Sequence, residues 1–211
     1  MGTGNGDKFM KILYGTTNNG KLQAMKNAVK DLDIELISLN DVDSALPNIN
    51  ENGTTPLENA EIKARAYYEA FRMPVFSCDS GLYFDEVKEE EQPGIHVRRI
   101  NGKELNDDEM IEYYTNLVKE YGGKLTAKWV YGMAVYNGEN FKTYSWEKDS
   151  FYFVAEPCTE RNPGYPLDSI SIVPKFNKYL VQLTPEEKNK QSEKGPTNDV
   201  IEFILDSLQY M

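Results

Sequence analysis

The stretch that decides the fold is Met10-Lys-Ile-Leu-Tyr-Gly-Thr-Thr-Asn-Asn-Gly-Lys21. It opens with a short apolar run, which predicts a β-strand, and Gly15 ends that run. Beyond the stretch, apolar residues recur at the spacing of a helix: Leu22, Met25, Val29 and Leu32. Asn18 and Asn19 are both available to cap that helix. The segment therefore predicts a strand, a tight polar loop and a helix.

Strand and helix signals continue to alternate after this opening. Residues 34–39 predict a second strand. Thr55-Pro-Leu-Glu58 is a capping box with proline at the first helical position, and it predicts a helix that Pro74 ends. Residues 75–78 predict the next strand, and Asp79-Ser-Gly81 predicts a turn at its end.

The second half of the chain carries longer β signals. A helix signal that begins at Asn106 is followed by two β-prone stretches, residues 125–136 and 141–156. Asn137-Gly138 between them is a hairpin signal. Residues 184–196 are rich in lysine and glutamate and predict a loop or a short helix, after which the chain closes with an amphipathic helix.

This order of elements predicts an α/β fold. We expect a mixed, twisted sheet flanked by helices and divided into two lobes, with a central active-site cleft. Residues 1–9 are expected to be a flexible leader or an expression scar. Residues 10–211 are expected to form a single domain of two lobes.

Composition narrows the classes of function. Lysine and arginine total 23 against 34 acidic residues, so the net charge is −11, which disfavours binding to long nucleic acid. Two cysteines and one histidine exclude a disulfide scaffold and a histidine-rich metal site. The sequence has neither an apolar run long enough to span a membrane nor a signal peptide, so we expect a cytoplasmic protein without membrane contact.

Residues 15–21 are a candidate phosphate-binding loop. Glycines let the backbone approach a ligand, free amides at the start of a helix attract anions, and Lys21 adds a positive charge. The spacing matches a P-loop, but Leu22 stands where a P-loop needs serine or threonine to hold magnesium. An ordinary strand-to-helix turn with a capping asparagine and a surface lysine would give the same pattern.

Three more charged residues are candidates for chemistry. Glu51 lies in a polar loop where its carboxylate can ligate a metal, whereas Glu58 is expected to be the capping acid of the helix. Lys63 lies at the edge of the apolar stripe of that helix, so it either reaches a neighbouring pocket or stays in solvent. Asp79 can hold Mg²⁺ or orient a water at a strand end, or it is simply a turn-forming aspartate.

Together these clusters resemble the inosine triphosphate pyrophosphatase family, which hydrolyses noncanonical purine nucleoside triphosphates to the monophosphate and pyrophosphate. Residues 16–21 are similar to the family's threonine-x-asparagine-x-x-lysine loop, and residues 51–64 to its glutamate loop and helix. Residues 79–82 and 93–95 resemble its aspartate turn and the loop after it. Residues 186–192 fall on its late nucleotide-binding segment.

The resemblance implies a role for each matched residue. The triphosphate would be held by Thr16, Asn18 and Lys21, with Lys63 helping to neutralise it. Glu51 would bind Mg²⁺, and Asp79 would ligate the metal or activate the water that attacks the α-phosphorus. The remaining nucleotide contacts would come from Ser80, Tyr165, Lys188 and Ser192, with Tyr165 stacked on the base. The family also implies a homodimer.

The chain departs from the family at three places. Cys78 occupies a position that is usually acidic. Ser192-Glu193-Lys194 replaces a serine-histidine-arginine run that reads the base, and Gly164-Tyr165-Pro166-Leu167 replaces a glycine-aromatic-aspartate-proline run, with Asp168 displaced. These departures fall at positions that bind the metal or recognise the base in the family, whereas the triphosphate loop keeps the family pattern.

We therefore expect a Mg²⁺-dependent nucleoside triphosphate pyrophosphatase that acts on ITP, dITP or XTP and cleans the nucleotide pool. One alternative is a pyrophosphatase for a different modified nucleotide, and another is a P-loop kinase or NTPase built on residues 15–21. A third is a nucleotide-binding module without turnover. Arg99 matches a family arginine and could support the phosphate cleft or the dimer, whereas His96 falls where the family has tyrosine.

Overall fold

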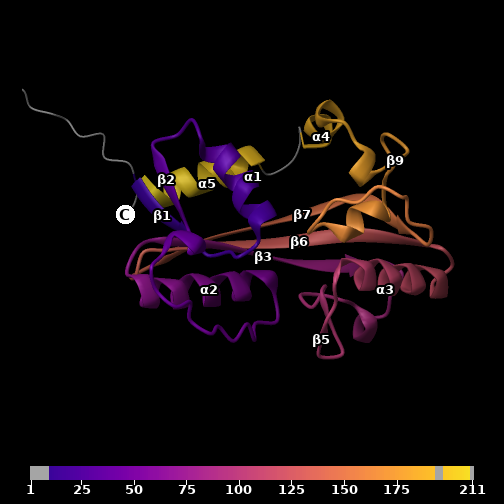
Figure 1. The fold of residues 1–211 in the computed structure, drawn as a ribbon, viewed down its shortest axis with the longest axis horizontal. Coiled ribbons are helices and arrows are strands. Elements are labelled where there is room, and N and C mark those ends of the chain that lie inside the picture. Colours follow the sequence, from indigo (N-terminus) through magenta and orange to yellow (C-terminus); the bar gives the residue numbers. More distant parts are fainter. Residues whose placement is uncertain (1–9, 193–196, 210–211) are drawn as a thin grey trace, which may run out of the picture.

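The computed structural model describes residues 10–192 and 197–209, and Figure 1 shows their arrangement. Within these ranges the main sheet contains β1 (Met10–Tyr14), β2 (Ile34–Ser38), β3 (Val75–Phe84), β6 (Lys124–Tyr136), β7 (Phe141–Val154), β8 (Ser171–Val173) and β9 (Lys178–Tyr179). A separate small hairpin pairs β4 (Arg99–Ile100) with β5 (Lys103–Glu104). The predicted leader, residues 1–9, lies outside the described part.

The helices are α1 (Asn19–Val29), α2 (Pro56–Phe71), α3 (Asp107–Glu120), α4 (Pro185–Ser192) and α5 (Thr197–Gln209). Short 3₁₀ turns occupy η1 (Leu39–Asp41), η2 (Glu89–Glu91), η3 (Pro166–Ser169) and η4 (Leu180–Gln182). No helix in the described ranges is long and apolar enough to cross a membrane.

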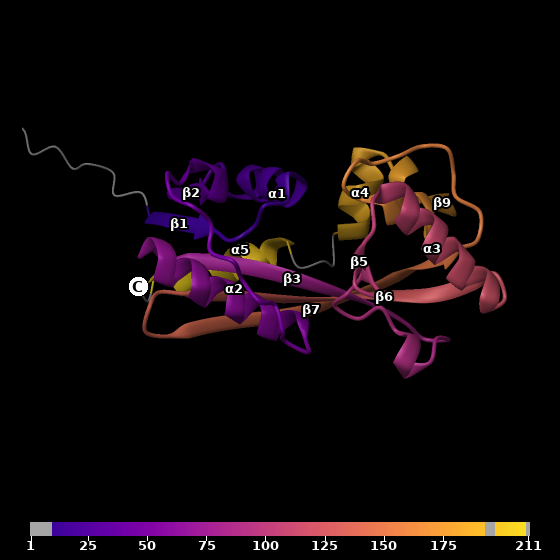
Figure 2. The ribbon, with the colours of Figure 1, turned by 60° about the horizontal axis from the view of Figure 1, so that its bottom comes forward.

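The main sheet is mixed, as the sequence predicts. Its strand order is β2-β1-β3-β6-β7-β8-β9. The strands β2, β1 and β3 run parallel, whereas β3, β6, β7, β8 and β9 pair antiparallel in succession. Figures 1 and 2 show that the long strands β3, β6 and β7 run through both lobes, with α1, α2 and α5 around one end and α3 and α4 at the other.

The two faces of the first lobe have separate hydrophobic cores. On one face α2 covers a cluster that includes Leu13, Ala64 and Ala134. On the other face α5 covers a cluster that includes Ile12 and Met133, against which residues of α1 also pack. Successive residues of one strand divide between the two clusters because their side chains point to opposite faces of a sheet.

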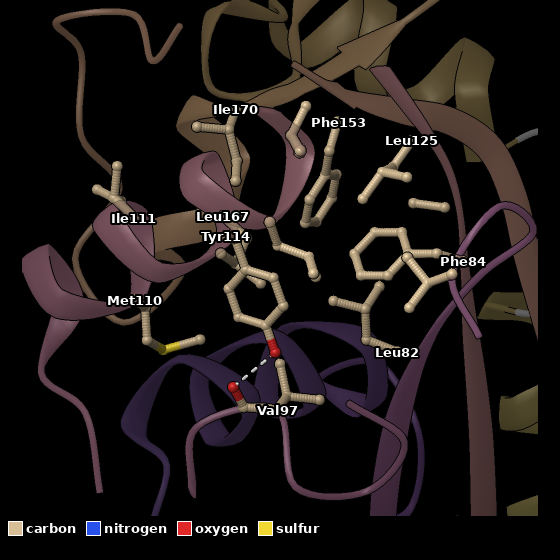
Figure 3. Close-up of a cluster of buried hydrophobic side chains, with 14 of the residues drawn as sticks. Leu82, Phe84, Val97, Met110, Ile111, Tyr114, Leu125, Phe153, Leu167 and Ile170 are labelled. Atoms are coloured by element: carbon tan, nitrogen blue, oxygen red, sulfur yellow. Dashed lines mark hydrogen bonds between the residues drawn. The ribbon is translucent and has the colours of Figure 1, made fainter. Parts of the chain in front are cut away.

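The second lobe is built around α3. Its buried cluster includes Leu82, Phe84 and Phe153 from the sheet and Tyr114 from α3. Figure 3 shows the Tyr114 phenol pointing at the backbone of Val97, where its hydroxyl donates a hydrogen bond of 2.8 Å to the carbonyl oxygen. This bond satisfies a fully buried hydroxyl and ties the Val97 segment to the core.

The predicted turn at Asp79-Ser-Gly81 is wrong. These residues lie in the middle of β3, which continues to Phe84 in unbroken antiparallel register with β6. The cross-strand ladder with β6 overrides the local turn preference of the three residues. The strand that ends near this point is β1, the other neighbour of β3. Its last pair with β3 is Tyr14 opposite Phe76.

Helix starts follow the sequence closely. Asn18, rather than Asn19, is the N-cap of α1, and Asn106 forms a capping box at the start of α3. Residues 184–196, for which the sequence predicts a loop or a short helix, contain the helix α4. Each of these signals is local, so sequence spacing alone suffices to detect it.

Candidate active site

The predicted phosphate loop connects β1 to α1. The Asn18 side-chain oxygen accepts a hydrogen bond of 3.0 Å from the backbone N–H of Lys21, and the Asn18 N–H donates to the Thr16 hydroxyl at 3.2 Å. The side chains of Thr16 and Asn18 therefore shape the loop through hydrogen bonds within it. The start of α1 presents further free N–H groups, which favour an anion.

An ion-paired cluster of Glu51, Lys63 and Asp79 lies against α2. The Lys63 ammonium is 3.1 Å from Glu51 Oε2 and 3.3 Å from Asp79 Oδ1. The Lys63 side chain is only 12% exposed and that of Asp79 18%, whereas Glu51 is 42% exposed. Burial lowers the pKa of Lys63, but the nearby carboxylates of Asp79 and Glu51 outweigh it, so the pKa lies above its ordinary value. Lys63 is a charged, partly buried group that holds the two acids together.

Glu58 has the structural role at the start of α2 that the sequence predicts for it. The Thr55 hydroxyl accepts from the Glu58 N–H at 3.2 Å. The Glu58 carboxylate accepts from both the N–H and the hydroxyl of Thr54, at 2.6 and 2.9 Å. The acid therefore reaches one residue further back than in a standard capping box. Its hydrogen bonds are all local to the start of the helix.

Two further contacts tie α2 to its surroundings, and the sequence analysis missed both. Asn59 is buried, and its side-chain oxygen accepts a hydrogen bond of 2.9 Å from the N–H of Gly53 in the loop that carries Glu51. On β3 the buried hydroxyl of Ser77 donates to the Ala60 carbonyl. These bonds connect α2 with the Glu51 loop on one side and with β3 on the other.

Gly132 on β6 lies directly opposite Asp79. A Cβ atom built on Gly132 would lie 2.3 Å from the backbone nitrogen of Leu57 and 2.4 Å from its Cα, in the first turn of α2. No real Cβ atom tolerates such contacts, so only glycine lets the helix approach the sheet this closely. The signal that could have found it is a glycine inside a β-prone run.

The edge of β3 is open beside this cluster. The Gly15 N–H donates to the Phe76 carbonyl, and the next backbone bonds on this edge join Leu82 to Gly94. Between these two sets of backbone hydrogen bonds, residues 77–81 of β3 have no strand partner on this edge among the described residues. Because alternate residues of a strand direct their backbone groups to the same edge, the N–H groups of Cys78 and Ser80 face the gap.

The cysteine that departs from the family pattern points away from the acidic cluster. Cys78 packs with the core on the α5 side, whereas Asp79 faces α2. Burial raises the pKa of the Cys78 thiol, although Lys21 and Lys63 are both close enough to lower it in part. Lys21, in α1, and Lys63, in α2, therefore both act electrostatically on this thiol.

The donor set suits a magnesium ion that is shared with a substrate. In the described part of the chain no group of three or more histidine, cysteine, aspartate or glutamate residues could hold a metal by itself. Glu51 and Asp79, however, are both within ion-pair distance of the same Lys63 ammonium. Mg²⁺ is commonly bound through one or two carboxylates together with substrate phosphates and water, so the two acids fit it.

The second lobe places one predicted residue, Tyr165, beside the phosphate loop, and it also contains the partly buried Asp168. Tyr165 lies so close to Gly20 that a Cβ on this glycine would be 2.7 Å from the tyrosine ring. Asp168 accepts a hydrogen bond of 2.9 Å from the Asn162 amide. Burial raises the pKa of Asp168, and the amide and the nearby Lys188 ammonium lower it only in part.

Some predicted base-recognition residues cannot be placed. Glu193 and Lys194 lie outside the described residues, and Ser192 is described only as the last residue of α4. Of the other predicted site residues, Glu51, Lys63 and Asp79 form one cluster. Tyr165 contacts Gly20 of the phosphate loop, and the Gly15 N–H joins the start of that loop to the Phe76 carbonyl of β3.

Comparison with known proteins supports the fold described above. Residues 12–198 match the Ham1 family. A dITP/XTP pyrophosphatase of Aquifex aeolicus is 32% identical over 195 residues, covering 88% of this chain and 92% of the relative. One of Lactobacillus acidophilus is 33% identical over 199 residues, with the same two coverages of 88% and 92%. Among solved structures, a HAM1 protein from Coxiella burnetii superposes with a TM-score of 0.73 at 26% identity, covering 94% of this chain and 99% of that one.

Proposed function

The chain belongs to the Ham1 family, and we propose that it is a nucleoside triphosphate pyrophosphatase for noncanonical purine nucleotides such as ITP, dITP or XTP. The products would be the nucleoside monophosphate and pyrophosphate. The observation that carries the proposal is the Glu51–Lys63–Asp79 cluster on α2 and β3, where β3 has an open edge. Such a site supplies positive charge, carboxylates and free N–H donors, which are what a triphosphate reaction needs.

The triphosphate would lie across the open edge of β3. Thr16, Asn18 and Lys21 would bind it from the phosphate loop, and Lys63 would reach it from α2. Ser80 would contribute its hydroxyl and its edge-facing N–H. The two lysines would then neutralise the phosphate chain from both sides, although the chain as a whole is acidic.

Hydrolysis would proceed by attack of water on the α-phosphorus. The water oxygen forms a bond to phosphorus, the bond to the bridging oxygen breaks, and pyrophosphate leaves with the bonding electrons. Asp79 would accept the proton of the water. Glu51 and Asp79 would hold Mg²⁺, which when bound supplies neutralisation of the charge on the phosphates.

The base would be held on the side of the second lobe. Tyr165, which lies against Gly20, would stack on it, while Lys188 and Ser192 would contact the nucleotide. We propose that the enzyme acts as a homodimer in the cytoplasm on the free nucleotide pool. The homodimer in this proposal rests on the resemblance to the family.

The experiment that tests the function is pyrophosphate release with Mg²⁺ across ITP, dITP, XTP, dUTP, modified pyrimidine nucleotides and the standard nucleoside triphosphates. Selective turnover of ITP, dITP or XTP is expected. Selective turnover of another nucleotide would refute the base preference and assign a changed specificity to the second lobe. Binding without turnover of any nucleotide would refute the enzyme activity and favour a binding module, whereas release of the γ-phosphate would favour a P-loop NTPase.

A further inference from the structure

Tyr165 is an exposed aromatic ring at the junction between the two lobes. Its side chain is 36% exposed, whereas most large apolar side chains in the described part of the chain are buried or half-buried. It comes from the second lobe but lies against Gly20 at the start of α1, where a Cβ would be 2.7 Å from both its ring and its hydroxyl. An exposed ring beside free N–H groups suits a ligand that has an aromatic part and an anionic part.

The loop before Tyr165 has one anchor outside itself. Gly164 has a φ of +82°, and the Tyr165 N–H closes a tight turn by donating to the Asn162 carbonyl at 2.9 Å. Among the described residues, one hydrogen bond joins residues 161–164 to the protein beyond residues 158–169, and in it the Gly164 N–H donates to Asp107 Oδ2 at 3.1 Å. The position of the Tyr165 backbone on this side therefore depends on Asp107.

Asp107, the first residue of α3, is itself held by Arg98. The Arg98 guanidinium donates to Asp107 Oδ1 at 2.8 Å and to the Leu105 carbonyl at 3.0 Å. Burial raises the pKa of Asp107, but the Gly164 N–H and the Arg98 guanidinium outweigh it, so the pKa lies below its ordinary value. The carboxylate is therefore charged at neutral pH, and each of its oxygens has a fixed partner.

Arg98 joins this arrangement to the acidic cluster. The neighbouring Val97 carbonyl accepts the hydrogen bond from the buried Tyr114 hydroxyl, which ties the backbone next to Arg98 to the core (Figure 3). Arg98 also lines a cavity of about 140 Å³ together with Glu51 and Asp79. The same arginine therefore borders the acidic cluster and holds the carboxylate that fixes the loop before Tyr165.

We propose that Asp107 is a positioning residue for Tyr165. By binding the Gly164 backbone it keeps the ring against Gly20 before a nucleotide arrives, so that binding does not have to order the loop. Asp107 acts through Tyr165 and does not contact the nucleotide itself. The identity of the ligand rests on the proposed function, whereas the bonds of Asp107 and the contact between Tyr165 and Gly20 are independent of it.

The test is equilibrium binding of IMP, the product that is not hydrolysed, together with steady-state kinetics on ITP. Asp107→Ala is expected to weaken IMP binding about fivefold, as loss of one hydrogen bond to a charged group does. It should raise KM for ITP by a similar factor and change kcat less, because Tyr165 contacts the phosphate loop rather than the acidic cluster. Asp107→Asn keeps an acceptor for the Gly164 N–H, so it should lose less affinity than Asp107→Ala.

A double-mutant cycle separates positioning from a general structural role. In a Tyr165→Ala background, Asp107→Ala should weaken IMP binding by less than about twofold further, because the ring that it positions is gone. Additive losses in the two variants would overturn the proposal, since they would mean that Asp107 acts on the ligand by a route other than Tyr165.

Asp108→Ala is the matched control. Asp108 is the next residue in the first turn of α3 and is exposed, so it carries the same charge at the helix start without bonding Gly164. Its loss should change IMP affinity by less than about twofold. Equal weakening by Asp108→Ala and Asp107→Ala would assign the effect to the charge of the helix start and would overturn the proposal.

Hydrogen–deuterium exchange of the protein without nucleotide tests the positioning independently of the activity. Asp107→Ala should speed exchange in residues 161–165 about fivefold, whereas Asp108→Ala should not. Faster exchange in Asp107→Ala, together with no binding or turnover of any nucleotide by the unmodified protein, would support the positioning and refute the pyrophosphatase. Unchanged exchange and unchanged IMP affinity in Asp107→Ala, with normal turnover by the unmodified protein, would do the reverse.

Discussion

Asp79 and Gly132 are opposite partners on the neighbouring strands β3 and β6, and the missing side chain of Gly132 makes room for the first turn of α2. The backbone of Leu57 occupies the space that any other residue would need for its Cβ. Further along the same helix, Lys63 reaches 3.3 Å from Asp79. The position of the ammonium relative to the carboxylate therefore depends on how closely the helix approaches this glycine.

Gly132→Ala should lower kcat about 10- to 100-fold, because the added methyl group must displace the start of α2 and with it Lys63 and Glu51. Binding of the triphosphate through the phosphate loop should change much less. Steady-state kinetics together with equilibrium nucleotide binding measure this difference. The control is Ala134→Gly, at a buried position of the same strand that also faces α2, which should cost about 0.5–1 kcal/mol of stability with kcat nearly unchanged.

Asp79→Asn should reduce turnover by about 10²- to 10⁴-fold while nucleotide binding is kept, since the amide cannot accept the proton of the attacking water. Single-turnover kinetics and equilibrium binding of a triphosphate separate the two effects. The same change at the exposed Asp85, just beyond β3, is the control. Near-normal turnover of Asp79→Asn would remove this residue from the catalytic role.

Lys21→Ala should weaken triphosphate binding more than binding of the corresponding nucleoside, because the ammonium acts on phosphate charge. A loss of about tenfold for the triphosphate is expected for one charge-assisted hydrogen bond. Equilibrium binding of both ligands tests this, with Lys30→Ala, at the exposed C-cap of the same helix, as control. An equal loss for both ligands would indicate that Lys21 acts through folding.

Asp168→Asn should raise the melting temperature at pH 7. Burial raises the pKa of Asp168 above its ordinary value of 3.8, so the folded state favours the protonated form. The stability that this residue costs therefore grows as the pH rises from the ordinary value through the raised one, and stays constant above it. Neutral asparagine avoids the cost, so its advantage should shrink as the pH falls toward 3.8.

Thermal unfolding of the protein and of Asp168→Asn between pH 3.5 and 7 checks the sign. The exposed Asp43→Asn is the control and should show no such pH-dependent difference. A constant difference between Asp168→Asn and the unmodified protein at every pH would assign the effect to packing instead.

Local signals explain which parts of the site were predictable. Asn18 caps α1, and Glu58 binds Thr54 at the start of α2, because each of these bonds joins residues close in sequence. The turn expected at Asp79-Ser-Gly81 was wrong for the opposite reason. The conformation of these three residues depends on backbone pairing with β6, a strand that follows much later in the chain.

Several features of the candidate site have no local signal. The bond between Asn59 and Gly53 needs α2 and its preceding loop to fold back on each other. The open edge of β3 exists only because β1 stops pairing at Phe76 while β6 continues on the other side. Neither could be seen in spacing or composition.

Apart from the strands β4, β5, β8 and β9, which it did not predict, the sequence by itself determined the helices and the other strands, the caps that begin α1, α2 and α3, and the resemblance that led to the proposed activity. These depend on hydrogen bonds and apolar spacing between near neighbours in the chain. Only the tertiary structure decided that Asp79 faces Lys63 while Cys78 faces away. It also decided that the missing side chain of Gly132 lets α2 pack closely against the face of the sheet that carries Asp79. The side on which a side chain lies is set by strand register, and strand register is a property of residues far apart in sequence.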